Sequence, residues 1–183
     1  MKQVHENKDG IINTVSGVEV NLLDPIPDMI NIEDIAHSLS YQCRFGGHVS
    51  RFYSVAQHSV MVAAMAPKEL KKYGLLHDAA EAYLQDITAP LKHIWGPAYK
   101  ILEERFMKVI SLKFGLDLEL FTAIKEFDKE AVEIEHNAFQ CGKLYEWQTK
   151  ARVLGEQPTP YSPEASRVLF MSSFMRYFGC KHL

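Results

Sequence analysis

The chain has 183 residues and a formal net charge of -3, and 47% of its residues are hydrophobic. This length suits one domain with a buried core and leaves little room for two. The slightly acidic balance gives no reason to expect a nucleic acid or an anionic membrane surface as a partner. Cys43, Cys141 and Cys180 are odd in number and far apart, which excludes a disulfide framework and a zinc ribbon.

No stretch approaches the roughly 18 apolar residues of a membrane-spanning helix. The N-terminal "MKQVHENKDGIINTV" has no apolar segment of the kind found in secretion signals. Isolated thiols are typical of a reducing compartment. We therefore expect a cytoplasmic protein without a membrane partner.

The first elements in chain order are a hairpin and a short helix. β-branched residues flank Ser16-Gly17, and Gly17 can adopt the positive φ of a tight turn, so a hairpin is predicted at about 10–24. After the break at "PIPDM", Asn31 is a suitable N-cap for a short helix. The following "YQCRFGGHVSRFY" is predicted to be a loop.

Helices are predicted for most of the remaining chain. Ser54 and Gln57 form a capping-box pattern, which predicts a helix starting at Val55. The other expected helices cover residues 67–84, about 99–114, about 118–149 and about 163–178. The pattern indicates a mostly α fold, a helical bundle with a small N-terminal hairpin, as a single domain over residues 1–183.

Several polar residues fall on helix faces that are otherwise apolar. His58 lies among small and apolar residues, and His77-Asp78 is followed by Glu81 on the same or a bordering face. Asp128 lies beside the apolar stripe of the last long helix before residue 150. An unpaired buried carboxylate is costly, so such groups are found paired or bound to a metal.

Imidazole and carboxylate ligands together favour a transition metal (Zn, Mn, Fe, Co or Ni) over calcium. A single inward histidine is, however, more often a hydrogen-bonded core residue, and a His-Asp dipeptide often occurs by chance. Spacing alone therefore predicts only a candidate metal site in an α-helical domain.

The order His58, then His77-Asp78, then Asp128 resembles the HD-domain superfamily of metal-dependent phosphohydrolases. The resemblance covers about residues 31–150. It is closer to small bacterial and phage HD proteins that share "CRFGGHVSRFYSVAQH" and "LLHDAAEAYLQDITAPLK". Relatives of this kind include 5'-deoxynucleotidases and phage dATP triphosphohydrolases.

The resemblance implies a role for each of nine residues. It implies His58, His77, Asp78 and Asp128 as ligands of a divalent transition metal, and Glu81 and Asp86 as catalytic acids or holders of a second ion. It also implies Arg44 and Lys92 as phosphate contacts, with Phe45 beside the sugar or base in place of a tryptophan. The expected substrate is a deoxynucleoside 5'-mono- or triphosphate, and the expected assembly is a homo-oligomer.

Two other functions remain open at this point. Small HD folds also hydrolyse signalling nucleotides, and a degenerate HD fold could be a non-catalytic nucleotide-binding module. A di-iron oxygenase is disfavoured, because only His93, His136 and His182 follow the His-Asp pair.

Overall fold

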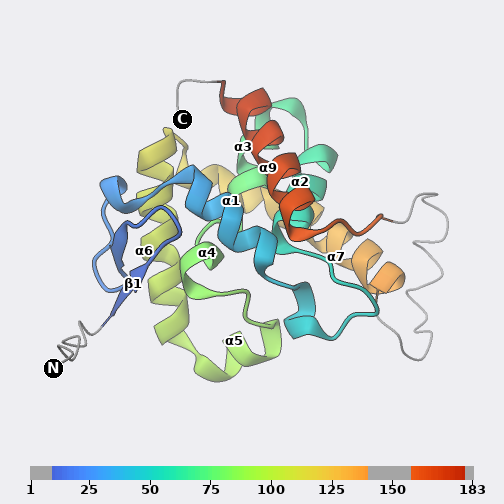
Figure 1. The fold of residues 1–183 in the computed structure, drawn as a ribbon, viewed down its shortest axis with the longest axis horizontal. Helices are drawn as coiled ribbons and strands as arrows, with labels where there is room; N and C mark the ends of the chain where they lie inside the picture. Colours follow the sequence, from blue (N-terminus) through green and yellow to red (C-terminus); the bar gives the residue numbers. More distant parts are fainter. Residues whose placement is uncertain (1–9, 140–157, 180–183) are drawn as a thin grey trace, which may run out of the picture.

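The computed structural model describes residues 10–139 and 158–179 of the chain. This part is mostly helical with one small two-stranded sheet, which confirms the expected fold class (Figure 1). The α-helices are, in chain order, α1 (Ile32–Tyr41), α2 (Val55–Met65), α3 (Lys71–Leu76), α4 (Glu81–Leu84), α5 (Ala89–Trp95), α6 (Pro97–Phe114), α7 (Lys125–Phe139) and α9 (Pro163–Phe178). The last of them, α9, packs across α1 and α2.

The predicted hairpin is present. Its strands are β1 (Ile11–Asn13) and β2 (Glu19–Asn21), which pair antiparallel. The buried Asp34 of α1 accepts hydrogen bonds from the backbone N–H and the hydroxyl of Ser16, at 2.9 and 2.6 Å. These bonds hold the turn of the hairpin against the helical part of the fold.

The predicted starts of α1 and α2 are confirmed by their caps. The Asn31 side chain accepts from the N–H of Glu33, and the Ser54 hydroxyl accepts from the N–H of Gln57. The other half of a capping box is not formed at α2, because the side-chain oxygen of Gln57 accepts from the N–H of Tyr161, while its amide nitrogen donates to the carbonyl of Thr159. Gln57 thus joins the start of α2 to the segment that leads into α9.

The prediction of one continuous helix over residues 67–84 is wrong. A short 3-10 turn (Lys68–Leu70) precedes α3, and the backbone tightens again over His77–Ala80 before α4 begins. There the N–H groups of Ala79 and Glu81 bond to carbonyls three residues back rather than four. The His-Asp pair therefore lies in a tight turn between two helices.

The helix predicted at 118–149 also starts later than expected. Leu118–Ile124 is a 3-10 segment, and α7 begins at Lys125. The predicted residues 140–149 lie outside the described part of the chain. The sequence also failed to predict α5, a short helix with a proline in its first turn.

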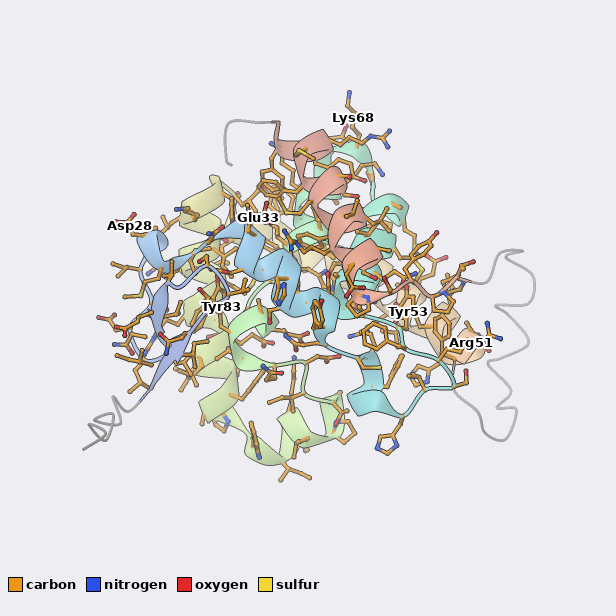
Figure 2. All side chains as sticks on the ribbon, in the orientation of Figure 1. Asp28, Glu33, Arg51, Tyr53, Lys68 and Tyr83 are labelled. Atoms are coloured by element: carbon orange, nitrogen blue, oxygen red, sulfur yellow. The ribbon has the colours of Figure 1, made fainter. Side chains whose placement is uncertain are left out.

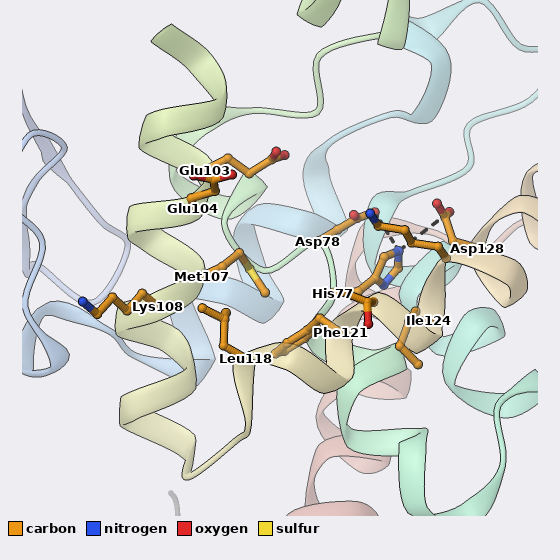
Figure 3. Close-up of a pocket in the computed structure, with 12 residues that line it drawn as sticks. His77, Asp78, Glu103, Glu104, Met107, Lys108, Leu118, Phe121, Ile124 and Asp128 are labelled. Carbon is orange, nitrogen blue, oxygen red and sulfur yellow. Dashed lines mark ion pairs between the residues drawn. The ribbon is translucent and has the colours of Figure 1, made fainter. Parts of the chain in front are cut away.

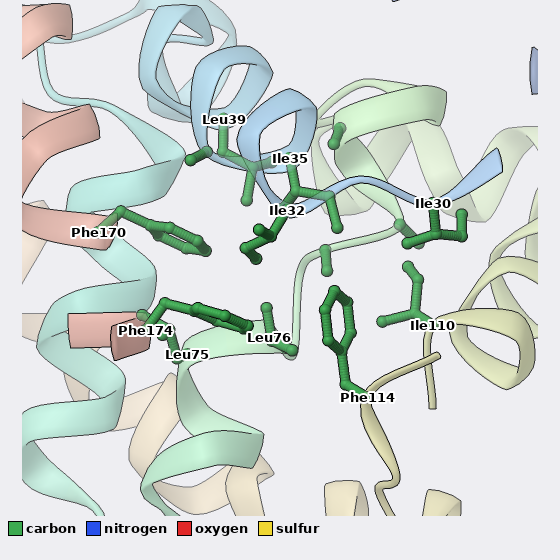
Figure 4. Close-up of a cluster of buried hydrophobic side chains, with 14 of the residues drawn as sticks. Ile30, Ile32, Ile35, Leu39, Leu75, Leu76, Ile110, Phe114, Phe170 and Phe174 are labelled. Atoms are coloured by element: carbon green, nitrogen blue, oxygen red, sulfur yellow. The ribbon is translucent and has the colours of Figure 1, made fainter. Parts of the chain in front are cut away.

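A large apolar core holds much of the bundle together (Figure 4). Phe170 and Phe174 of α9 meet Ile35 of α1, Leu76 of α3 and Phe114 of α6, and none of the five is more than 4% exposed. Figure 2 shows side chains filling the space between the helices, with Tyr53 and Tyr83 among the buried ones. The core thereby fixes α2 and α3, which carry the two histidines of interest.

These two helices approach each other closely at Gly74. A Cβ placed on Gly74 would lie 2.8 Å from the Cα and 3.0 Å from the backbone N of Ala63 on α2. The first distance is shorter than real Cβ atoms show, and the second is tighter than most Cβ contacts, so only glycine permits this spacing without a shift of the backbone. The close approach brings His58 on α2 within reach of His77 at the end of α3.

Candidate metal centre

His58 and His77 face each other across the junction of α2 and α3. Their Nε2 atoms are 3.3 Å apart, and their ring centroids are 5.2 Å apart. His58 is fully buried, whereas the side chain of His77 is 10% exposed. The pair is therefore accessible from the side of His77.

A hydrogen-bond acceptor lies at the other nitrogen of each ring. The Nδ1 of His77 is 2.8 Å from the carbonyl oxygen of Gly74, and the Nδ1 of His58 is 2.7 Å from Oε1 of Glu135. A carbonyl can only accept, so Nδ1 of His77 carries a proton. In a neutral ring that donates from Nδ1, Nε2 presents its lone pair, which is the arrangement that a metal-binding histidine needs.

Two aspartates complete the group. Oδ1 of Asp128 is 3.1 Å from Nε2 of His58 and 3.8 Å from Nε2 of His77. Oδ2 of Asp78 lies 3.6 and 3.2 Å from the same two nitrogens. His58, His77 and Asp128 each offer a ligand atom within 4.8 Å of the others, and this cluster could hold a metal ion.

The spacing suits a first-row transition metal. Bonds of about 2.0–2.1 Å to nitrogen and oxygen place neighbouring ligands about 3.3–3.4 Å apart at a tetrahedral centre. The five distances between the imidazole nitrogens and their neighbours run from 3.1 to 3.8 Å. The donor set of two imidazoles and carboxylate is one that such metals prefer.

The charged groups around the histidines shift the pKa values of His58 and Asp128. Burial and the Arg44 cation act to lower the pKa of His58, but the carboxylates of Glu135 and Asp128 raise it to about 9. Burial alone would raise the pKa of Asp128, yet hydrogen bonds from His58 and His77 bring it well below its usual range. Without a metal, a proton on His58 neutralises part of this negative charge.

Glu81 and Asp86 lie next to this group on the side of α4. Burial and the charges of Asp78 and Asp86 raise the pKa of Glu81 well above its ordinary value, although Lys92 opposes them. Lys92 of α5 donates to Oε1 of Glu81 at 2.9 Å and to Glu103 of α6 at 3.0 Å. Among the described residues, Oε2 of Glu81 and Oδ2 of Asp86 are buried without a hydrogen-bond partner.

The side chain of Gln42 holds the segment between Glu81 and Asp86 in place. Its side-chain amide donates to the carbonyl of Glu81 at 2.9 Å, and its carbonyl accepts from the N–H of Asp86 at 2.8 Å. Between them Gln85 has φ 73°, a value that residues other than glycine rarely adopt. This turn brings Asp86 back towards the metal ligands.

Arg44 is more enclosed than its predicted role implies. The residue is only 8% exposed, and its guanidinium lies 3.6 Å from Asp86 and 3.4 Å from Glu135. The guanidinium of Arg44 therefore already has two carboxylate partners.

Phe45 has φ 58° and packs against His136, with ring centroids 4.5 Å apart.

A cavity of about 720 Å³ opens beside the metal ligands (Figure 3). Its polar end is formed by the side chains of His77, Asp78 and Asp128. Dashed lines in Figure 3 mark the ion pairs of His77 with the two aspartates. The remaining wall comes from α6, the 3-10 segment and α7. It is lined by Glu103, Glu104, Met107, Lys108, Leu118, Phe121, Thr122, Ile124 and Lys125. Neither Arg44 nor Phe45 is among these residues.

The sequence reasoning missed Glu135 and the cavity wall. Glu135 is fully buried, but in "AVEIEH" it resembles an ordinary surface acid. Its position gave a usable signal, because Asp128, Ala131 and Glu135 are spaced by three and four residues and thus share one face of α7. The cavity depends on three separated segments, and no local pattern predicts it.

Together, the fold and site define a mostly helical protein with a histidine–aspartate cluster able to hold a metal ion. No protein-family model matches the chain. In the described part, no helix is long and apolar enough to cross a membrane.

Two curated proteins are similar to the chain, and both are named as uncharacterized. It is 52% identical over 101 residues to the protein YfdR of Escherichia coli, a match that covers 55% of this chain and 56% of YfdR. It is 38% identical over 126 residues to the protein RCAP_rcc00048 of Rhodobacter capsulatus, which covers 64% of each chain. Both matches thus span less than two thirds of the relative's length.

Proposed function

We propose that this protein is a metal-dependent phosphohydrolase of the HD type that acts on deoxynucleotides. The observation that carries the proposal is the convergence of His58, His77, Asp78 and Asp128, the last three of which line one end of a cavity. The resemblance of the two long motifs to HD nucleotidases and triphosphohydrolases supports the substrate class. Phosphoryl transfer mainly needs positive charge and in-line positioning, and a metal site beside a cavity can supply both.

The proposed ligand set has four members. The three-residue cluster lacks Asp78, but Asp78 Oδ2 lies at ligand spacing from both imidazoles. A bound divalent transition metal would polarise the phosphate and lower the pKa of a coordinated water to about 7. Asp78 and Asp128 both line the cavity and would bind the metal from its open side.

Glu81 is the proposed proton donor to the leaving group. Burial and the charges of Asp78 and Asp86 raise its pKa well above the ordinary value, which favours the protonated carboxyl that such a role needs. Lys92 occupies Oε1, so the proton belongs on Oε2, the oxygen without a partner among the described residues. Asp86, whose pKa burial also raises, would assist in proton transfer or help to hold a second ion.

Lys92, which contacts Glu81, is the proposed phosphate contact beside the two acids. Burial would lower the pKa of Lys92, but Glu81 and Glu103 raise it, so the ammonium stays charged. Its partner Glu103 lines the cavity, although Lys92 itself is not among the lining residues. The predicted phosphate role of Arg44 remains a hypothesis that rests on the family resemblance.

The cavity offers a place for the nucleoside. Its volume of about 720 Å³ falls within the range of small-molecule pockets, about 300–1,000 Å³. Met107, Leu118 and Phe121 give it an apolar wall against which a base can pack. Within this cavity Phe121 is the proposed aromatic contact for the base. The contact of Phe45 with the sugar or base stays a hypothesis that rests on the family resemblance.

A product-identity screen tests the proposal. Deoxynucleoside mono- and triphosphates are incubated with the protein and Mn, Co, Zn or Mg, with Asp128→Ala as the background control. Orthophosphate released from a monophosphate identifies a nucleotidase, and intact tripolyphosphate identifies a triphosphohydrolase. Cleavage of a cyclic dinucleotide or guanosine polyphosphate, with no deoxynucleotide cleaved, would contradict the substrate class and leave only the metal chemistry.

A further inference from the structure

Glu135 is a fully buried carboxylate beside the metal centre, in contact with His58. It lies on α7, two helical turns after Asp128. A buried carboxylate without partners is strongly destabilising, so its contacts identify its function. One oxygen contacts His58 and the other contacts Arg44, and the buried Tyr53 hydroxyl also interacts with the carboxylate.

The first oxygen contacts a proposed metal ligand. Oε1 of Glu135 lies 2.7 Å from Nδ1 of His58, a short distance typical of a charge-assisted hydrogen bond. A carboxylate accepts this bond, so the imidazole donates from Nδ1 and directs Nε2 towards His77 and Asp128. His58 is fully buried and cannot obtain this orientation from solvent.

The second oxygen contacts a cation. Oε2 of Glu135 accepts from Nε and a terminal nitrogen of Arg44, both at 3.4 Å. Arg44 is held near α2 because its N–H bonds to the carbonyl of Tyr53 and because Cys43 and Ser54 form a β-bridge. These two contacts hold Arg44 beside the start of α2, next to Glu135.

We propose that Glu135 is the positioning residue of the metal centre, and that Arg44 is the counter-ion that holds Glu135 in place. This inference rests on the metal binding of the proposed function. The contacts form a chain from the metal site through His58 and Glu135 to Arg44. Arg44 then affects metal affinity as well as any contact that it makes with phosphate.

A purely structural ion pair would have the same contacts but different consequences. Breaking such a pair lowers the stability of the fold and leaves the metal affinity of the folded protein unchanged. A positioning role changes the metal affinity itself, because the orienting partners of metal ligands typically affect it by about 10–100-fold. Metal affinity in folded variants therefore separates the two readings.

The experiment compares the metal dissociation constants of Glu135→Gln, Glu135→Asp and Arg44→Gln by competition with a chromophoric chelator, without substrate. The glutamine amide can donate to Nδ1 of His58 and so favour the tautomer that carries hydrogen on Nε2. We expect Glu135→Gln to raise the dissociation constant about 10–100-fold, and Glu135→Asp, which keeps the charge, to raise it less. Glu133→Gln, at an exposed position two residues away on α7, is the matched control and should change nothing.

The proposed counter-ion role of Arg44 is tested separately. Arg44→Gln should also weaken metal binding, and the double variant should lose less than the sum of the single effects, because both act through His58. A folded Glu135→Gln protein with parental metal affinity would overturn the proposal. Unchanged metal affinity in Arg44→Gln would overturn the counter-ion role.

A measurement on the unsubstituted protein tests the proposal even if the variants do not fold. Long-range ¹H–¹⁵N spectra of the metal-loaded protein should show His58 protonated at Nδ1 and not at Nε2. A proton on Nε2 would overturn the proposal. A parent protein that binds no metal would contradict both this inference and the proposed function, whereas equal binding by parent and variant contradicts the inference alone.

Discussion

The Nε2 atoms of His58 and His77 lie 3.3 Å apart although the residues belong to different helices. Two features of the backbone produce this contact. Gly74 lets α3 approach the backbone of α2, and the tight turn after Leu76 directs His77 and Asp78 to the same site. The chemistry of the site thus depends on the packing of two helices as much as on its side chains.

Replacing either aspartate should remove the metal. We expect Asp128→Ala and Asp78→Ala to weaken metal binding by more than about 100-fold, beyond the 10–100-fold typical of an orienting partner. Elemental analysis after dialysis measures this directly. Glu130→Ala, at an exposed position on the same helix as Asp128, is the control and should keep the parental metal content. Undiminished metal in Asp78→Ala would exclude Asp78 as a ligand.

Metal affinity should increase with pH. In the metal-free protein the pKa of His58 is raised from 6.5 to about 9, so the ring is protonated at neutral pH and must lose a proton when a metal binds. We therefore expect an affinity gain of about tenfold per pH unit from pH 7 to about 9, and little further gain above that. The same proton stabilises the metal-free fold at low pH, and this contribution is lost as the pH rises through about 9.

Calorimetric titrations in buffers of different ionisation enthalpy can count the proton released from His58. About one proton per metal is expected at pH 7. No release at pH 7, together with an affinity that does not change with pH, would contradict this assignment.

Glu81→Gln should separate metal binding from turnover. The amide cannot supply the proton that we assign to Glu81, so turnover should fall by about 10²-fold or more. The metal content should stay at the parental level, because Glu81 is not among the proposed ligands. Glu69→Gln, at an exposed position before α3, is the control. Parental turnover in both Glu81→Gln and Asp86→Asn would make these residues structural acids.

Gly74→Ala should destabilise the protein and weaken the metal site together. The new Cβ would lie 2.8 Å from the Cα of Ala63, so α2 and α3 must move apart. Overpacking of this kind typically costs about 1–3 kcal/mol, which denaturant unfolding can measure. Because the contact is with backbone, adding Ala63→Gly should not rescue the loss. Unchanged stability in Gly74→Ala would show that the helices can separate freely.

The sequence predicted elements well where local chemistry determines them. The caps of α1 and α2, the hairpin turn and the end of α6 at Gly115, which has φ 64°, all depend on residues within a few positions. The break over His77–Ala80 was missed, because its residues are compatible with a continuous helix. That break is visible only in the backbone bonding of the folded chain.

The candidate site was predictable in part. Polar positions on apolar faces and the family resemblance predict His58, His77, Asp78 and Asp128, and the structure brings all four together. Phe45 was expected beside the sugar or base, but it packs on His136 and does not line the cavity. Its environment depends on a loop closed by long-range contacts, which the sequence does not reveal.

The most direct test of the central claim is a metal titration of nucleotide hydrolysis. The protein is stripped with a chelator, and a single divalent metal is added in steps while turnover of a panel of deoxynucleoside mono- and triphosphates is followed. We predict no turnover in the stripped protein and a rise that ends at about one equivalent of metal per chain, absent in His58→Ala. Hydrolysis that survives stripping, or no hydrolysis of any deoxynucleotide at any metal ratio, would contradict the proposed function.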